Sequence, residues 1–195
     1  MTDALNEANL MLSDWSTRPG PNWWATDTIT QVLTAGTATY TLAATTIQLI
    51  AVYIDTGSGQ SQTDRIISPL SSYEYAALPN KNQQGQPTSF WFDRQTTPQI
   101  SMWPVPDDSQ TYTLKMRRWR QLQDTTLPGG SQPEIPWRFQ DTFVWELAAR
   151  MAWIYKPENV DKLEARARMA WDRAATNDAE NVPVFIFPGL ASYYN

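Results

Sequence analysis

The sequence predicts an α+β protein: a three-helix bundle with an inserted antiparallel β-sandwich or barrel-like domain and an extended C-terminal tail. Three observations predict this class. Apolar residues recur every three and four positions near both ends of the chain, as they do on one face of a helix. The region between is rich in threonine, valine, isoleucine and aromatic residues in short runs separated by turn residues, which is typical of strands. The last fifteen residues contain an apolar run bracketed by two prolines.

Residues 1–21 hold the first predicted helix, over residues 2–16. Its apolar stripe consists of Leu5, Ala8, Leu12 and Trp15. The Thr-Arg-Pro-Gly-Pro run at 17–21 ends this helix, because proline lacks an amide hydrogen and glycine permits a turn.

Residues 22–124 form the predicted β domain. Strands are expected at residues 24–33, 38–42, 46–55, 64–69, 88–93, 99–103 and 111–122. Ser71 and Ser72 are candidate N-caps for one short helix at 73–78, which Pro79 ends. Polar connections at 34–37 and 57–61 are short enough for hairpins, so we expect a sandwich or a small barrel.

Residues 125–136 form a linker rich in proline and glycine, and residues 137–180 regain the helical period. The stripe of the first helix, from about 137 to 155, consists of Val144, Leu147, Ala148, Met151 and Tyr155. The stripe of the second consists of Val160, Leu163, Ala167, Trp171 and Ala174. Lys156-Pro157 joins the two helices tightly, so they form an antiparallel hairpin that completes the bundle with the first helix.

Residues 181–195 form the extended tail. Its candidate anchors are apolar or aromatic: Val184, Phe185, Ile186, Phe187, Leu190, Tyr193 and Tyr194. An exposed apolar segment favours aggregation unless something covers it. The tail therefore docks either on its own domain or on another protein.

The chain contains no histidine and no cysteine. This composition excludes a Ser-His-Asp triad, a Cys-His pair and the usual zinc sites. Carboxylate-only chemistry stays open, but Asp107 and Asp108 are typical of a turn. We expect no catalytic residue, no metal and no cofactor.

The net charge is −5, and ten residues are tryptophan. The negative net charge argues against wholesale wrapping of nucleic acid, and no apolar run approaches the roughly 20 residues that span a bilayer. The amino end lacks the pattern of a signal peptide, so we expect an intracellular product with no membrane partner. Tryptophans are common in cores and in protein interfaces, and so many indicate some use in interfaces.

One basic cluster lies on the last predicted strand. It consists of Lys115, Arg117, Arg118, Trp119 and Arg120. Strand alternation sends Lys115, Arg117 and Trp119 to one face and the other two to the opposite face. The cluster therefore forms ion pairs within the chain, or contacts an acidic neighbouring subunit, or meets DNA phosphate in a channel.

Several segments, taken together, resemble one family. LNEANLMLSDWS (5–16), ISPLSSYEYAALPNKNQQGQPTSFWFDR (67–94), QISMWPVPDDSQTYTLKMRRWRQLQD (99–124) and IPWRFQDTFVWELAARMA (135–152) follow in order. They resemble the tailed-phage head-to-tail adaptors related to tail tubular protein A. The chain differs in beginning almost directly on the first helix, where such adaptors often have another helix.

The resemblance implies a structural virion protein at the head–tail junction, made in the host cytoplasm. Such adaptors form a ring of twelve copies beneath the portal. The ring extends the DNA channel, helps to retain packaged DNA and gives the tail nozzle or other tail proteins a platform. DNA passes through during ejection without sequence-specific contact, and the tail residues named above would bind the portal.

Two alternatives stay open. If the chain were another tail or baseplate component, this would explain the strand-rich region at 22–124 but not the helices on either side of it. A carbohydrate-binding β module would instead line one exposed groove with several tryptophans.

Overall fold

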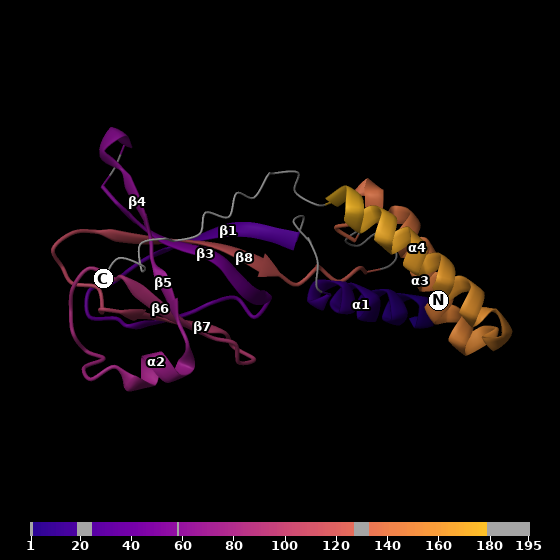
Figure 1. Cartoon of the computed structure of the whole chain (residues 1–195), viewed down its shortest axis with the longest axis horizontal. Helices are drawn as coiled ribbons and strands as arrows, with labels where there is room; N and C mark the ends of the chain where they lie inside the picture. Colours follow the sequence, from indigo (N-terminus) through magenta and orange to yellow (C-terminus); the bar gives the residue numbers. More distant parts are fainter. Residues whose placement is uncertain (1, 19–24, 58, 127–132, 179–195) are drawn as a thin grey trace, which may run out of the picture. The chain divides into compact units, whose positions relative to one another are not determined.

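The computed structural model describes residues 2–18, 25–57, 59–126 and 133–178 (Figure 1). These residues divide into two compact units. The first, the β unit, holds the N-terminal helix with all the strands, and the second, the helical unit, holds residues 136–178. The α+β class that the sequence predicts is therefore confirmed.

Helix α1 runs from Thr2 to Thr17 and buries an apolar stripe within the amphipathic sequence. The buried residues are Ala8, Met11, Leu12 and Trp15, whereas Leu5 is only half-buried. Two side chains tie α1 to the segment that follows the last strand. The Asn9 side chain donates to the Thr125 carbonyl at 3.2 Å and accepts from the Thr125 amide at 2.9 Å. The Ser16 hydroxyl accepts from the Leu122 amide at 3.0 Å.

Eight strands form two four-stranded sheets (Figure 1). The first sheet has the order β1 (Thr26–Val32), β8 (Tyr112–Arg120), β3 (Thr46–Thr56) and β4 (Thr63–Ile66). The second has the order β2 (Thr39–Thr41), β7 (Gln99–Trp103), β6 (Ser89–Asp93) and β5 (Ser68–Leu70). Neighbouring strands are antiparallel except β5 and β6, which are parallel.

The apolar core of the β unit lies between these sheets. On β8 the residues Tyr112, Leu114 and Met116 are buried, with less buried residues between them. Val52 and Ile54 of β3 join the same cluster, as do residues from β6 and β7. The arrangement is an open sandwich, and the described strands close no barrel. Burial of such side chains stabilises a fold by about 1.5–3 kcal/mol each.

The strand predicted at 64–69 is wrong in one respect, because it divides between the two sheets. Ile67 is the buried residue at the crossing. Its amide donates to the Val52 carbonyl in the first sheet at 3.1 Å, and the Ser68 amide donates to the Thr88 carbonyl beside the second at 3.0 Å. Each half of the run thus satisfies its backbone groups in a different sheet.

A short helix, α2 (Ser72–Ala77), follows β5, as the sequence predicts, and contacts β5 and β6 (Figure 1). Ser71 is its N-cap: the hydroxyl accepts from the Glu74 amide, and the Glu74 carboxylate accepts from the Ser71 amide. This capping box satisfies amides that the first helical turn leaves without partners.

The helical unit is an antiparallel hairpin. A 3-10 turn, η3 (Trp137–Phe139), leads into α3 (Gln140–Tyr155), and η4 (Pro157–Asn159) leads into α4 (Val160–Asp178). The Arg138 guanidinium donates to the buried Asp178 carboxylate, so the start of one helix is tied to the end of the other. Phe139 packs edge-to-face on Trp171, with ring centres 5.6 Å apart.

The sequence predicts the wrong buried face for α3. Val144 and Tyr155, both in the predicted stripe, are 59% and 60% exposed. The buried residues are Thr142, Glu146, Ala149 and Ala152, and α4 presents the small residues Ala167, Ala170 and Ala174. Small side chains on both helices permit close packing, and this favours the alanine face over the bulkier apolar face. On α4 the predicted stripe is largely correct, because Val160, Ala167 and Ala174 are buried.

The predicted bundle of α1 with this hairpin stays a prediction, because α1 belongs to the β unit and the hairpin forms the other unit. The antiparallel hairpin itself is present.

Candidate functional site

The outer surface of the helical unit carries large apolar side chains. The exposed ones on η3, α3 and α4 are Trp137, Val144, Trp153, Ile154, Tyr155 and Met169. Of the sixteen residues of α3, only Gln140, Asp141, Thr142, Glu146 and Arg150 are polar. The exposed apolar side chains of α3 therefore fit contact with another protein surface.

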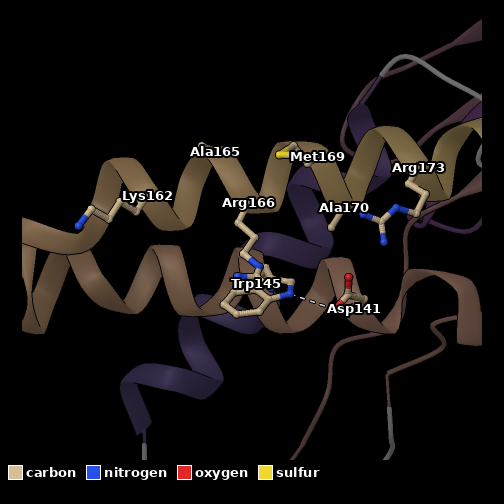
Figure 2. Close-up of a pocket in the computed structure, with 8 residues that line it drawn as sticks. All are labelled: Asp141, Trp145, Lys162, Ala165, Arg166, Met169, Ala170 and Arg173. Atoms are coloured by element: carbon tan, nitrogen blue, oxygen red, sulfur yellow. Dashed lines mark hydrogen bonds between the residues drawn. The ribbon is translucent and has the colours of Figure 1, made fainter.

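A groove runs between α3 and α4 (Figure 2). We call it the cationic groove, and its lining residues are Asp141, Trp145, Lys162, Ala165, Arg166, Met169, Ala170 and Arg173. The Arg166 guanidinium lies 4.2 Å from the centre of the Trp145 ring, close enough for a cation–π contact. The Trp145 indole N–H donates to the Asp141 carboxylate at 3.0 Å.

Three basic residues of α4 face this groove at helical spacing. They are Lys162, Arg166 and Arg173, and all three are exposed. Within the described part of the chain, none of them forms an ion pair. The sequence-based prediction gave the charged residues of α4 no role and therefore missed this groove. The spacing by four and seven residues was the available signal.

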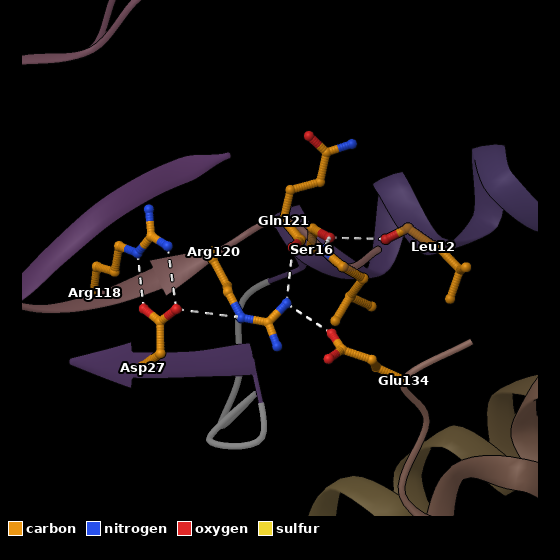
Figure 3. A network of polar contacts seen from close by, with 8 residues as sticks. Leu12, Ser16, Asp27, Arg118, Arg120, Gln121 and Glu134 are labelled. Atoms are coloured by element: carbon orange, nitrogen blue, oxygen red, sulfur yellow. Dashed lines mark hydrogen bonds and ion pairs between the residues drawn. The ribbon is translucent and has the colours of Figure 1, made fainter. Parts of the chain in front are cut away.

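The basic cluster of β8 is mostly neutralised inside the chain (Figure 3). Arg118 is buried and lies opposite Asp27 on β1. Its guanidinium donates to both Asp27 oxygens, from Nε at 2.7 Å and from Nη2 at 3.1 Å, and to the Thr46 hydroxyl at 2.6 Å. Because Arg118 favours the ionised carboxylate, the pKa of Asp27 is lowered from its ordinary value.

Arg120 lies on the same side of β8 as Arg118, as strand alternation predicts. Its Nε is 3.6 Å from Asp27, and its Nη1 is 2.7 Å from the Glu134 carboxylate (Figure 3). The pair Asp27 and Glu134 thus holds Arg120 between β1 and the segment before the helical unit.

The other members of the cluster lie on the opposite face. The Lys115 ammonium is 2.8 Å from Asp55 and 3.2 Å from Asp64, two carboxylates that face each other across β3 and β4. The hydrogen bond to Asp55, assisted by Asp64, raises the pKa of Lys115. Trp119 is half-buried, and Arg117 is the one exposed member. The geometry supports ion pairs within the chain, and a contact with a neighbouring subunit or with DNA stays a prediction.

The predicted tail anchors, Val184 to Tyr194, lie outside the described residues. Portal binding by this segment therefore stays a prediction.

The tryptophans of the described residues do not line one groove. Trp91 stacks on Tyr75 with ring centres 5.0 Å apart, and the Trp103 indole donates to the Asn80 carbonyl at 3.1 Å. Trp137 and Trp153 are 80% and 64% exposed, but both belong to the helical unit. Sixteen residues separate them, which is about 24 Å along a helix. This spacing does not fit a sugar platform on the β unit.

Within the described ranges, no group of three or more acidic side chains could hold a metal ion. Asp107 accepts hydrogen bonds from the Ser109 and Tyr112 hydroxyls, and these bonds lower its pKa. It is thus a turn residue, as its position after two prolines predicts. The described helices include none long and apolar enough to cross a membrane.

The exposed apolar residues of the helical unit and the cationic groove are surfaces of a kind that is common where proteins meet. The family model described as SU10 adaptor protein matches residues 1–182. The chain belongs to this family of phage head–tail adaptor proteins. No curated protein matches it. The matched residues end at 182, so the predicted tail anchors lie beyond them.

Membership gives the chain a general structural role in the virion, in association with other phage head or tail proteins.

Proposed function

We propose that this chain is a non-enzymatic head-to-tail adaptor subunit that forms a ring beneath the portal. The family match over residues 1–182 carries the proposal. The ring extends the DNA channel, helps to retain the packaged genome and offers the tail nozzle or other tail proteins an attachment platform. The proposed ring contains twelve copies of the chain, which is the number that the resemblance of the sequence to the adaptors implies.

The surface of the helical unit supports assembly. Val144 and Ile154 of α3 are large apolar residues that are 59% and 51% exposed. Apolar and aromatic side chains in such numbers are typical of subunit contacts. A ring that repeats one contact between identical subunits needs a surface of this kind on every copy.

The internal neutralisation of β8 supports passage of DNA without adhesion. Arg118, Arg120 and Lys115 are held by carboxylates of the same chain. Dense unpaired cations would bind DNA phosphates by releasing counterions and would slow the moving duplex. A chain of net charge −5 avoids this retardation.

We further propose that the tail binds the portal through Val184, Phe185, Ile186, Phe187, Leu190, Tyr193 and Tyr194. The apolar run between two prolines supports this role, since such a segment buries its side chains when it orders on a partner.

The test is a pull-down with purified portal. The full chain should bind, and the chain without residues 184–195 should remain folded but lose binding. The pair Phe185→Ser and Phe187→Ser should weaken binding strongly, whereas Ser192→Ala in the same segment should not. Undiminished binding of the truncated chain would contradict the tail assignment. Failure of the full chain to bind portal would contradict the adaptor role.

A further inference from the structure

Helix α4 carries opposite charges on two sides of its exposed surface. Lys162, Arg166 and Arg173 line the cationic groove on one side. Asp161, Glu164 and Asp172 form the acidic flank on the other side, where Arg168 lies among them and pairs with Glu164. At 100° per residue, the two sets are centred more than a quarter-turn apart, with the buried alanine stripe on the far side of the helix.

The two flanks match in length. Lys162 and Arg173 are eleven residues apart, and so are Asp161 and Asp172. Eleven residues are about three helical turns, or about 16 Å. When two copies of α4 lie side by side and parallel, Asp161 and Asp172 of one copy can therefore face Lys162 and Arg173 of the other in a single register.

The cationic groove also contains residue types that are common at the centre of protein interfaces. Met169, between the basic residues, is 66% exposed. The guanidinium of Arg166 lies over the Trp145 ring, 4.2 Å from its centre, and this contact holds it at the groove (Figure 2). Arginine, tryptophan and methionine are enriched where proteins meet. On the acidic flank, Glu164 is engaged by Trp153 and Arg168, whereas Asp161 and Asp172 are exposed.

We infer that the acidic flank of α4 in one copy docks in the cationic groove of the next copy. The partner is thus a second copy of this chain. The inference rests on the proposed ring and specifies its contact. Because the two surfaces differ, the contact is head-to-tail, and repetition closes a ring when the rotation between copies permits it. An antiparallel two-fold contact between the same helices would instead place like charges together.

A charge-swap experiment tests this contact. The cation-reversed variant carries Lys162→Glu and Arg173→Glu, and the acid-reversed variant carries Asp161→Lys and Asp172→Lys. Assembly is measured by native mass spectrometry and sedimentation, for the full chain alone and on purified portal, after circular dichroism confirms folding. The control variant carries Arg65→Glu and Arg94→Glu, which make the same change of net charge as the cation-reversed variant, on exposed residues of the β unit.

Each reversed variant alone should raise the concentration for half-assembly about tenfold or more, because like charges then face each other. An equal mixture of the two should assemble again, since the reversed surfaces are complementary. One chain that carries all four substitutions should assemble by itself, and the control variant should assemble like the wild type.

If the wild type forms rings and both reversed variants form rings equally well, the inference is wrong, but the proposed ring still stands. A wild-type chain that forms no ring, alone or on portal, would contradict the proposed function itself. A final product no larger than a dimer would overturn the head-to-tail contact. If the cation-reversed variant forms normal rings but no longer retards a short DNA duplex in a gel, the groove is a DNA surface and the inference is wrong.

Discussion

Arg118 and Asp27 face each other across two neighbouring strands, and the guanidinium donates to both oxygens of the carboxylate. This cross-strand pair ties the edge strand β1 to the central strand β8. It also gives the buried guanidinium of Arg118 a charged hydrogen-bond partner within the β unit. The pair therefore contributes to stability in a way that depends on pH.

The first prediction concerns acid unfolding. Folding lowers the pKa of Asp27 from its ordinary value of 3.8 because Arg118 stabilises the ionised form. The resulting stabilisation is present above about pH 4 and is lost as the pH falls through the lower folded value. Asp27→Asn should therefore lower the thermal midpoint by about 2–4 °C at pH 7, for a loss of about 1 kcal/mol.

Thermal unfolding of both chains between pH 3 and pH 7 measures this difference, which should shrink at the acid end. The control is Asp64→Asn, since Asp64 is more exposed and shares Lys115 with Asp55. Its effect should stay within about 0.5 kcal/mol. Equal effects of the two substitutions at every pH would contradict the prediction.

The second prediction concerns the attachment of α1. Asn9 exchanges two hydrogen bonds with the backbone of Thr125, 116 residues away. Asn9→Ala removes both bonds and should cost about 1–2 kcal/mol in urea unfolding. Asn6→Ala makes the same change of helix propensity at an exposed position of α1 and should not destabilise the chain. If both variants lose a similar amount of unfolding free energy, the contact with Thr125 contributes nothing to stability.

The third prediction concerns the open end of the hairpin, opposite the turn that joins α3 to α4. Asp178 is buried, and Arg138 is its cationic partner. Arg138→Met leaves a buried carboxylate without its charge partner, which should destabilise the helical unit by about 3 kcal/mol. Hydrogen exchange of the α3 and α4 amides measures the loss. Arg168→Met removes an exposed ion pair with Glu164 and should change protection by less than about 0.5 kcal/mol. Unchanged protection in the Arg138 variant would contradict the prediction.

The local pattern of the sequence predicted most elements of the fold. The strand at 99–103 and the capped helix after Ser71 are both present because their signals are short-range. The alternation of β8 correctly placed Arg118 and Arg120 on one face. It could not indicate that Arg118 is buried, because its partner Asp27 lies 91 residues away in the chain. The division of the 64–69 run likewise depends on distant strands.

The packed face of α3 could not be chosen from the sequence, because the helix is apolar on more than one side. The predicted stripe includes Val144 and Tyr155, which are exposed, whereas Ala149 and Ala152 are buried. The small buried residues of α4 decide which face of α3 packs against it. Hydrophobic periodicity gives the position of apolar residues in a helix but not the size of the side chains that they meet. The cationic groove exists only when Trp145 and Arg166 are brought together from two helices, so the spacing of the basic residues on α4 could indicate only one side of it.

The most direct test of the adaptor role is the mass of the complex that the full chain forms with purified portal, compared with the mass of each component alone. Native mass spectrometry should show a complex heavier than the portal by a fixed multiple of the chain mass, twelve copies in one closed ring. A portal mass that stays unchanged at saturating chain, or that increases by a single copy, would contradict the account.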